Sequence, residues 1–404
     1  MHVPAHPPPA LLKLAMTMMG ERFFFVAATM VLDDSALLCS KQQHGLLMIA
    51  LILSIVGSLI PISWAETGQW VKYSGNPVLS PTPGGWDARE VLMPRLLYDG
   101  TIFRMWYLGY RSETELNLGK IGYATSQDGI AWTKHPDPVL TPGSQGAWDA
   151  SSVWGGSVIW NGSKFVMWYR GEGRGFEEGA VGLATSSDGV SWTKYAANPV
   201  LKATSIDKAE LGHPYVIWDG SEYKMWYNGR SDSGKMRIFL ATSGDGIAWT
   251  KRTSPVVSTS PSGWDAGWVY CPTVIFDGSK YGMWYSAMDR NYQYRGIGYA
   301  TSDDGVSWRK STTNPILSGG PAGAWDGYGA VDNQGVLMFR GKVMLYYSAY
   351  QLVGQEQVSY KIGLAESPEG FAIPEMPLGA FGLILGLVLF TGYAIIRRRR
   401  PNLD

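Results

Sequence analysis

Residues 219–249 read DGSEYKMWYNGRSDSGKMRIFLATSGDGIAW, and two phrases of this stretch recur along the chain at intervals of about 60 residues. The triplet MWY stands at 105–107, 167–169, 225–227 and 283–285, with the variant LYY at 345–347. The phrase ATSxDGxxW stands at 124–132, 184–192, 241–249 and 300–308. A self-similar period of this length indicates a repeat architecture, so it determines the fold class before any single residue is interpreted.

Each repeat reads as four short strands. In the third copy we expect strands at 215–218, 223–227, 237–242 and 248–251, with turn pairs such as Asp219-Gly220 and Asp245-Gly246 between them. Four antiparallel strands per repeat are typical of a propeller blade. No segment between the two ends of the chain has a helical period. The sequence therefore predicts an all-β, five-bladed β-propeller with four-stranded antiparallel blades.

Residues 70–79, WVKYSGNPVL, supply the strand that the last repeat lacks. The fourth-strand phrase W-x-K follows each of the first four repeats, but the fifth repeat ends at Phe371 without it. Residues 70–79 match the spacing of residues 192–201, WTKYAANPVL. We therefore expect the N-terminal strand to pair with the last blade and close the ring, which removes the sheet edges of an open array. The predicted propeller domain is 66–371.

The two ends are predicted to lie outside the propeller. Residues 1–65 are interpreted as an N-terminal extension and signal peptide, because an apolar run at 46–62 precedes the small residues Ser63 and Ala65. In the C-terminal segment 372–404, residues 378–396 carry no charge and as a helix would span roughly 28 Å, close to the thickness of a bilayer core. The arginines at 397–400 predict a cytoplasmic C-terminus, a single membrane pass and a propeller outside the cell.

The C-terminal segment also resembles the sorting signals of prokaryotic surface proteins, in which a Pro-Glu motif precedes a hydrophobic helix and an arginine cluster. Pro374-Glu375 corresponds to that motif, and Met376 departs from its best-known versions. The resemblance implies a sorting transpeptidase as a partner. We therefore expect the protein to be secreted and anchored to the cell surface, either by the membrane helix or by an anchor that replaces it.

Composition narrows the class of partner and cofactor. The formal net charge is zero, which argues against a nucleic-acid partner. Beyond the predicted signal peptide the only cysteine is Cys271 and the only histidines are His135 and His213. The sequence therefore predicts neither an internal disulfide nor a histidine-rich metal site, and we expect no cofactor and no metal.

Aspartates that recur with the repeat are interpreted as structural. A Trp-Asp pair precedes the first strand of four repeats, at 86–87, 148–149, 264–265 and 325–326, and Asp207 stands alone in the third. A second set stands in the hairpins, at Asp128, Asp188, Asp245 and Asp304. Five aspartates at one spacing indicate turn or capping groups rather than five catalytic acids. Most tryptophans also occupy repeat positions, which predicts packing between blades.

The strand phrase xDGxxYxMWYxG and the hairpin phrase SxDGxxW resemble those of the five-bladed glycosidases of families 43, 32, 68 and 130, over residues 69–371. The hairpins also resemble a shortened Asp-box of sialidase propellers, in which the aspartate is structural. In families 43 and 32 an Asp beside the first-blade proline is base or nucleophile, a second-blade Asp tunes pKa values, and a third-blade Glu is the general acid. This chain departs from that pattern, because Met93, Gly155 and Gly212 stand at the three positions.

Glu90 and Glu210 are the candidate catalytic residues. They occupy the same relative place in the first and third blades, and Glu210 lies two residues before Gly212, on the same face of a regular strand and displaced by roughly 7 Å. Two carboxylates that face one cavity form the acid and base of glycosidic cleavage. The alternative is that both are rim carboxylates paired with Arg89 and other arginines.

Residues that break the repeat near the centre are candidates for substrate binding. Trp154 and Trp268 can stack on sugar faces or pack between blades, and His213 can shuttle a proton or be structural. Arginines that follow MWY can form a ring around the cavity mouth that suits hydroxyl-rich or anionic glycans, or a solvated rim of charge pairs. The remaining candidates are Arg89, Arg111, Arg170, Arg230, Tyr270, Arg290 and Asp332.

These observations favour an extracellular glycoside hydrolase-like protein that cleaves or processes an oligosaccharide or polysaccharide in the central cavity of the propeller. The alternative is a non-catalytic carbohydrate-binding or adhesion propeller at the cell surface, which kept the scaffold without the acids. A third reading is a scaffold for protein partners.

Overall fold

The computed structural model describes residues 70–112, 118–173, 179–208, 210–230, 233–327, 332–350, 352–353, 356–357 and 359–367. The predicted signal peptide, transmembrane segment and sorting motif lie outside these residues, so they stay predictions. The chain divides into two units, Met1–Pro61 and Ile62–Asp404, and every described residue belongs to the second. In this part of the chain, no helix has the length and apolar character to cross a bilayer.

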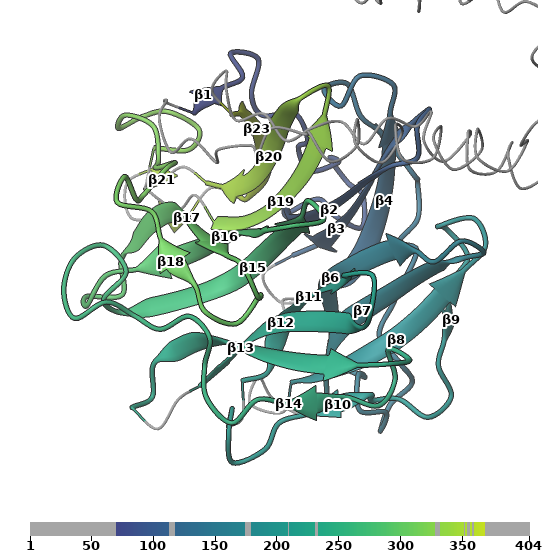
Figure 1. Cartoon of the computed structure of the whole chain (residues 1–404). Helices are drawn as coiled ribbons and strands as arrows, with labels where there is room; N and C mark the ends of the chain where they lie inside the picture. The colour runs from purple at the N-terminus through teal and green to yellow at the C-terminus, as the bar shows by residue number, and fades with distance from the viewer. Residues whose placement is uncertain are drawn as a thin grey trace, which may run out of the picture. The chain divides into compact units, whose positions relative to one another are not determined.

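Five antiparallel sheets form five blades, as the repeat predicts, and each blade runs from an innermost strand to a short outer one (Figure 1). From the inside outward, blade one contains β2 (Glu90–Tyr98), β3 (Phe103–Tyr110), β4 (Lys120–Ser126) and β5 (Thr133–Lys134). Blade two contains β6 (Ser152–Trp160), β7 (Phe165–Glu172) and β8 (Ala180–Ser186), and both β9 (Thr193–Lys194) and β10 (Leu201–Lys202) pair with β8. Blade three contains β11 (Gly212–Trp218), β12 (Tyr223–Arg230), β13 (Met236–Ser243) and β14 (Thr250–Lys251).

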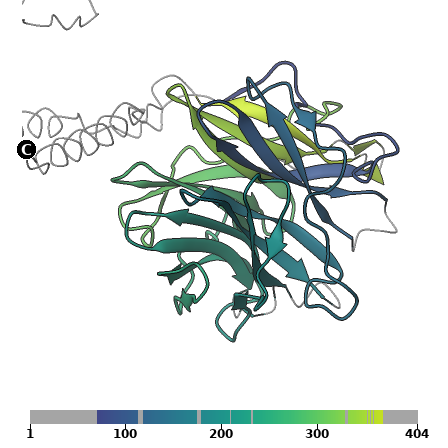
Figure 2. The same cartoon turned by 90° about the vertical axis from the view of Figure 1, so that its right-hand side faces the viewer.

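Blade four contains β15 (Trp268–Phe276), β16 (Tyr281–Met288), β17 (Tyr294–Ser302) and β18 (Arg309–Lys310). Blade five contains β19 (Asp332–Phe339), β20 (Lys342–Ala349), β23 (Lys361–Glu366) and β1 (Val71–Lys72), and a separate hairpin joins β21 (Leu352–Val353) to β22 (Glu356–Gln357). The strands β2, β6, β11, β15 and β19 surround the centre in Figure 1, and Figure 2 shows the twisted sheets from the side. The all-β, five-bladed prediction is confirmed for the described residues.

The N-terminal strand closes the ring as predicted. β1 pairs antiparallel with β23, with Val71 opposite Glu366 and Lys72 opposite Ala365. The Lys72 ammonium group also donates a 2.6 Å hydrogen bond to the Asp326 carboxylate. The first and last segments of the propeller are therefore joined by backbone pairing and by an ion pair.

The repeated Trp-Asp aspartates lie in structural contacts. In blade two, Asp149 accepts hydrogen bonds from the Tyr169 hydroxyl at 3.0 Å and from the Lys194 ammonium group at 2.6 Å. The aspartates Asp87, Asp207, Asp265 and Asp326 each form the equivalent ion pair with a lysine, respectively Lys134, Lys251, Lys310 and Lys72. Each lysine comes from a short outer strand, so these pairs tie the outer edge of a blade to the loop before its first strand. These contacts agree with the structural interpretation of the repeat aspartates.

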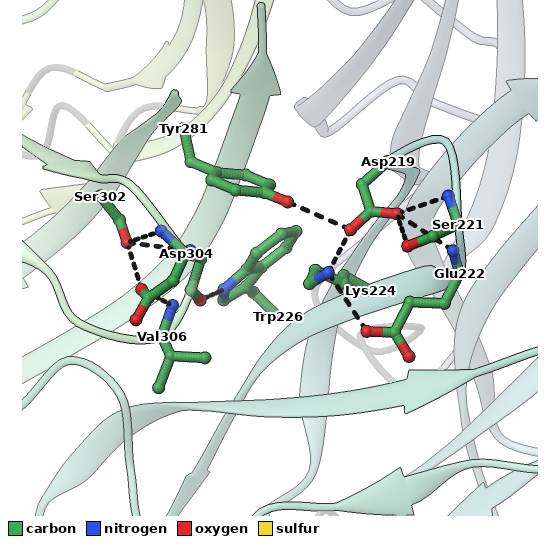
Figure 3. A network of polar contacts seen from close by, with 10 residues as sticks. Asp219, Ser221, Glu222, Lys224, Trp226, Tyr281, Ser302, Asp304 and Val306 are labelled. Atoms are coloured by element: carbon green, nitrogen blue, oxygen red, sulfur yellow. Dashed lines mark hydrogen bonds and ion pairs between the residues drawn. The ribbon is translucent and has the colours of Figure 1, made fainter. Parts of the chain in front are cut away.

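Hairpin aspartates and buried tryptophans connect neighbouring blades (Figure 3). Asp304 Oδ1 accepts the backbone N–H of Val306 at 2.8 Å, which shapes the outer hairpin of blade four. The Trp226 indole of blade three donates to the Gly305 carbonyl of that hairpin at 3.0 Å. Trp106 and Trp168 make the same contact with the next hairpin along the chain, at 2.9 and 2.8 Å. The apolar core therefore lies largely between blades, which leaves the inner strand ends for polar groups.

Candidate functional site

Each innermost strand is interrupted by a bulge at the same place. The pairing of the first two strands shifts between Leu92 and Arg95 in blade one, and in equivalent positions of the other four blades. The residue at the bulge has a positive φ in four of the blades: Met93 (55°), His213 (49°), Cys271 (50°) and Asn333 (48°). Non-glycine residues rarely adopt this conformation, and such strain is concentrated at functional sites. The ring of bulges therefore marks the candidate site.

Polar side chains from the preceding blade hold these bulges. The backbone N–H of Met93 donates to Ser348 Oγ at 3.0 Å, and that of Asn333 donates to Ser286 Oγ at 3.1 Å. Both serines directly follow the MWY phrase of their blade or its LYY variant. The bulges also resolve the register of blade five, because Gln334 stands where blade one has Pro94. Asp332 thus immediately precedes the bulge residue, as Leu92 does in blade one.

Burial favours the protonated form of the Asp332 carboxyl group. Asp332 is 2% exposed, and burial raises the pKa of its carboxyl group to about 8. Hydrogen bonds from Asn333 and Tyr270 oppose this rise, and the negative charge of Glu90 adds to it. Its Oδ2 atom lies 3.4 Å from the Tyr270 hydroxyl. Its Oδ1 atom has no hydrogen-bond partner among the residues that the structure describes. Asp332 is therefore a buried carboxyl group whose protonated form is favoured.

Glu90 shares this environment from the neighbouring blade. It is 6% exposed and lies opposite Tyr110 in the β2–β3 pair. Burial raises the pKa of its carboxyl group, while the Arg89 charge and a backbone hydrogen bond from Tyr360 act in the opposite direction. The Arg89 Nε atom lies 3.8 Å from Glu90 Oε1. The Glu90 charge thus acts electrostatically on Asp332, while Arg89 and the Tyr360 backbone oppose the rise in the pKa of Glu90 itself.

A third buried carboxylate, Glu172, ends β7 and is one of the charged residues after the second strands that the sequence suggests for the cavity mouth. It forms a 2.5 Å ion pair with Arg170, whose guanidinium group lies 4.6 Å from the centre of the Trp154 ring. Burial raises the pKa of Glu172, and the Arg170 charge opposes this rise. Burial, followed by the charges of Glu90 and Glu172, raises the pKa of the Tyr110 hydroxyl, so both carboxylates act on Tyr110 electrostatically. The sequence feature that marks Glu172 is its position in the repeat, which is equivalent to those of Tyr110 in blade one and Arg230 in blade three.

His213 is a neutral residue at the centre. Burial lowers the pKa of its imidazole to about 3, and the positive charges of Arg170 and Arg95 act in the same direction. Its ring packs edge-on against Trp154, with 5.9 Å between ring centres. His213 can thus donate or accept a hydrogen bond at neutral pH without carrying a charge. Its predicted role in proton transfer or substrate binding stays a prediction.

Glu210 has a different environment from Glu90. Its carboxylate forms an ion pair with Arg230, and the two side chains are 22% and 37% exposed. Within the described part of the chain, no hydrogen bond or ion pair joins Glu210 to Glu90 or Asp332. The ion pair with Arg230 is the contact expected of a rim carboxylate, and a catalytic role for Glu210 stays a prediction.

The other candidate binding residues are distributed around this centre. Trp268 lies 6.5 Å from Tyr270 between ring centres, and both residues precede the bulge of blade four. Arg290 donates to the Pro261 carbonyl, and Arg111 is exposed after the end of β3. The predicted arginines therefore have separate surroundings: Arg170 is buried at the centre, whereas Arg111 and Arg290 are on the surface.

Three tyrosines near Asp332, namely Tyr294, Tyr350 and Tyr360, are not predicted as site residues from the sequence. Burial and the Asp332 charge raise the pKa of Tyr294, and a hydrogen bond from Tyr360 opposes the rise. Tyr350 packs edge-on against Tyr360, with 4.7 Å between ring centres. Within the described residues, no group of three His, Cys, Asp or Glu side chains is arranged to hold a metal ion. The centre thus combines carboxyl groups with phenols and indoles, a set that can hydrogen-bond to and stack on a polyhydroxylated ligand.

Comparisons with known proteins agree with this chemistry. The sequence model for the glycosyl hydrolases family 32 N-terminal domain matches residues 94–276. An uncharacterized protein of Mycobacterium tuberculosis (strain H37Rv) is 29% identical over 259 residues, which cover 62% of this chain and 84% of that protein. The 1,2-beta-oligomannan phosphorylase of Thermoanaerobacter sp. (strain X514) is 23% identical over 313 residues, which cover 76% of this chain and 97% of the relative.

Solved structures share the fold. One comes from the GH130 family of mannoside phosphorylases, a family described as containing glycoside hydrolases that target β-1,2-mannosidic linkages in Candida mannan. It is 20% identical, with a TM-score of 0.58, and the match covers 78% of this chain and 98% of that structure. The chain is therefore a glycoside hydrolase-like five-bladed propeller: it resembles the family 32 N-terminal domain and the oligomannan phosphorylase in sequence and shares the fold of the GH130 structure, and these comparisons support a glycosidase-like enzyme.

Proposed function

We propose that this protein cleaves glycosidic bonds at the inner ends of β2 and β19, with Asp332 as the proton donor. One observation carries the proposal: the Asp332 carboxyl group is buried, its pKa is raised to about 8, and Oδ1 has no hydrogen-bond partner among the described residues. A glycosidase needs such a protonated acid to give a proton to the departing oxygen of the glycosidic bond.

Glu90 is the second carboxylate of this mechanism. Burial raises the pKa of Glu90, Arg89 and the Tyr360 backbone oppose that rise, and we assign the proton of the pair to Asp332. In an inverting reaction Glu90 takes a proton from the attacking water, and in a retaining reaction it attacks the anomeric carbon. Glu210, the partner predicted from the sequence, is the second candidate for this role and is held by Arg230.

β-1,2-linked mannosides are the first substrates to test, because two relatives are named for or associated with these linkages. The products distinguish two reactions of the same site. Water as the nucleophile releases free mannose, whereas inorganic phosphate as the nucleophile yields mannose 1-phosphate. Either reaction needs Asp332 to protonate the leaving group.

The proposed place of the reaction is outside the cell. The basis is the predicted signal peptide at 1–65 and the uncharged run at 378–396 followed by arginines. Deletion of residues 378–404 is expected to release the propeller into the medium. Retention of the truncated protein in the cytoplasm would contradict this location.

The second candidate function is carbohydrate binding without cleavage. It is favoured by Met93, Gly155 and Gly212, which stand where the resembling families 43 and 32 have their acidic residues. Binding of a mannoside with no turnover, with or without phosphate, is the result that would favour this candidate over the enzyme.

The experiment incubates wild-type protein with β-1,2-manno-oligosaccharides, with and without inorganic phosphate, and separates the products by chromatography. Asp332→Asn and Glu90→Gln are expected to abolish cleavage, and Glu210→Gln determines whether Glu210 shares the role. Asp304→Asn is the control, because Asp304 lies in an outer hairpin. If the variants at Asp332 and Glu90 cleave as fast as wild type, the proposed acid and base are wrong.

A further inference from the structure

Arg95 is a buried arginine at the centre of the propeller. It comes from β2, two residues after the Met93 bulge, and is 2% exposed. Its Nη1 group donates to the backbone carbonyls of Pro94 and Gln334, each at 3.0 Å. The groups that act electrostatically on Arg95 include Tyr215 of blade three and Cys271 of blade four. Arg95 belongs to blade one, donates a hydrogen bond to blade five and interacts electrostatically with residues of blades three and four. It therefore lies where the inner strands converge.

One edge of the Arg95 guanidinium group has no hydrogen-bond partner among the described residues. Among the described residues neither Nε nor Nη2 has a hydrogen-bond acceptor, and no Asp or Glu forms an ion pair with this side chain. Nε–H and Nη2–H lie on the same side of the planar group and form the fork that binds an anion with two parallel hydrogen bonds. A buried guanidinium group without a counter-charge is costly, because the low-dielectric interior does not replace water.

The neighbouring side chains do not supply the missing negative charge. Burial raises the pKa of the Cys271 thiol well above its ordinary 9.0 and that of the Tyr215 phenol to about 12, so both groups are neutral at physiological pH. The Gln334 side chain is fully engaged: Nε2 donates to the Cys271 carbonyl at 2.6 Å and to the Trp284 carbonyl at 2.8 Å, and Oε1 accepts from Ser286 at 2.9 Å.

The local charge is that of one uncompensated cation. Arg170 acts on His213 and Cys271 as Arg95 does, so two guanidinium groups contribute to the potential there. Arg170 is neutralised by Glu172 at 2.5 Å, which leaves Arg95. The inner strands are also closely packed, since a Cβ added at Gly335 would lie 2.3 Å from the Pro94 carbonyl oxygen. A single positive charge in a tight space favours a small monovalent anion over a sulfate or phosphate.

We propose that a halide-sized inorganic anion, chloride under physiological conditions, binds the Nε–Nη2 edge of Arg95 at the centre of the propeller. The anion compensates the buried charge and joins the inner strand of blade one to those of the blades around it. This site is separate from the proposed glycan site, because Arg95 follows Glu90 by five residues along β2, beyond the bulge.

Bromide in the crystallisation solution tests the site directly, since bromide replaces chloride and scatters anomalously. The expected result is an anomalous peak at hydrogen-bonding distance from both Nε and Nη2 of Arg95. An ordered water at that edge with no anomalous signal, or no density there at all, overturns the proposal. This measurement uses the wild-type protein and does not depend on whether any variant folds.

Thermal unfolding in solution provides the second measurement. At constant ionic strength, replacing gluconate with chloride is expected to raise the Tm of the wild-type protein saturably, by about 5 °C. Arg95→Met is expected to show no such rise. Arg104→Met is the matched control, because Arg104 already has a carboxylate partner, Asp99, at 2.9 Å, and this variant is expected to keep the chloride dependence. An equal chloride effect in all three proteins overturns the proposal.

Discussion

Asp332→Asn removes a carboxyl group whose charged form is disfavoured by burial in the folded propeller. The pKa of Asp332 rises from 3.8 to about 8 on folding because the side chain is buried. Each unit of such a shift corresponds to about 1.4 kcal/mol, so the full difference is on the order of 5 kcal/mol. Asparagine resembles the protonated acid in shape and does not titrate, which makes it a direct replacement for the neutral form.

The sign of the pH dependence follows from proton binding. Between about pH 4 and pH 8 the folded state binds more protons at Asp332 than the unfolded state does, so this residue's stabilising contribution is lost as the pH rises through that range. The Asp332→Asn variant lacks this loss. We therefore expect wild type and variant to be similar near pH 4, and the variant to be more stable at pH 9, by up to about 5 kcal/mol.

Urea denaturation from pH 4 to pH 9 measures this difference as a change in the unfolding midpoint. Asp304→Asn is the control in a hairpin: burial is outweighed there by hydrogen bonds from the Ser307 and Val306 backbone, which lower the pKa of Asp304 to about 2. Its stabilising charge is present above about pH 4 and is lost only as the pH falls towards 2, so this variant should be less stable than wild type by a constant amount from pH 5 to 9. A constant difference for Asp332→Asn as well would refute the raised pKa.

Two further predictions concern the scaffold. Lys72→Met should lower the free energy of unfolding by about 1–2 kcal/mol, because it leaves the buried Asp326 without its 2.6 Å ion pair. Lys194→Met in blade two is the matched control, since Lys194 forms an ion pair of the same geometry with Asp149. If urea unfolding shows a loss of stability for Lys194→Met but none for Lys72→Met, the ion pair has no role in ring closure. Arg340→Asn should stabilise the protein by about 0.5–1 kcal/mol, because Arg340 (φ 50°) and Gly341 (φ 74°) form a two-residue hairpin turn for which Asn-Gly is favoured. A lower thermal midpoint for this variant would show that the contact of Arg340 with the Phe339 ring, at 4.9 Å, outweighs the turn preference.

The repeat made the scaffold predictable. Blade number, strand order and the closing pair of Val71 with Glu366 all follow from phrases that recur with one spacing. The same comparison of blades singled out Glu90, whose position is shared by Glu210 in blade three, and Asp332 in blade five. Repeat spacing and departures from the repeat are properties of the local sequence, so both are predictable without the structure.

The environment of each site residue was less predictable, because it depends on contacts between blades. Blade five has Gln334 in place of the proline found in three other blades, so its register was open by one residue, and Asp332 could not be placed before the bulge was seen. Arg95 reads in sequence as an ordinary charged strand residue. Its burial follows from the bulge at Met93 and from convergence of five strands, neither of which a single repeat encodes.

The pH dependence of cleavage tests the central claim most directly. On a β-1,2-manno-oligosaccharide, kcat/KM of the wild-type protein is expected to fall as the pH rises above about 8, because Asp332 loses its proton there. Asp332→Asn is expected to lower the rate by about 100-fold to 10,000-fold at neutral pH. A rate that is unchanged in this variant, or wild-type protein that binds the glycan and releases no product with either water or phosphate, would contradict the proposed glycosidase mechanism.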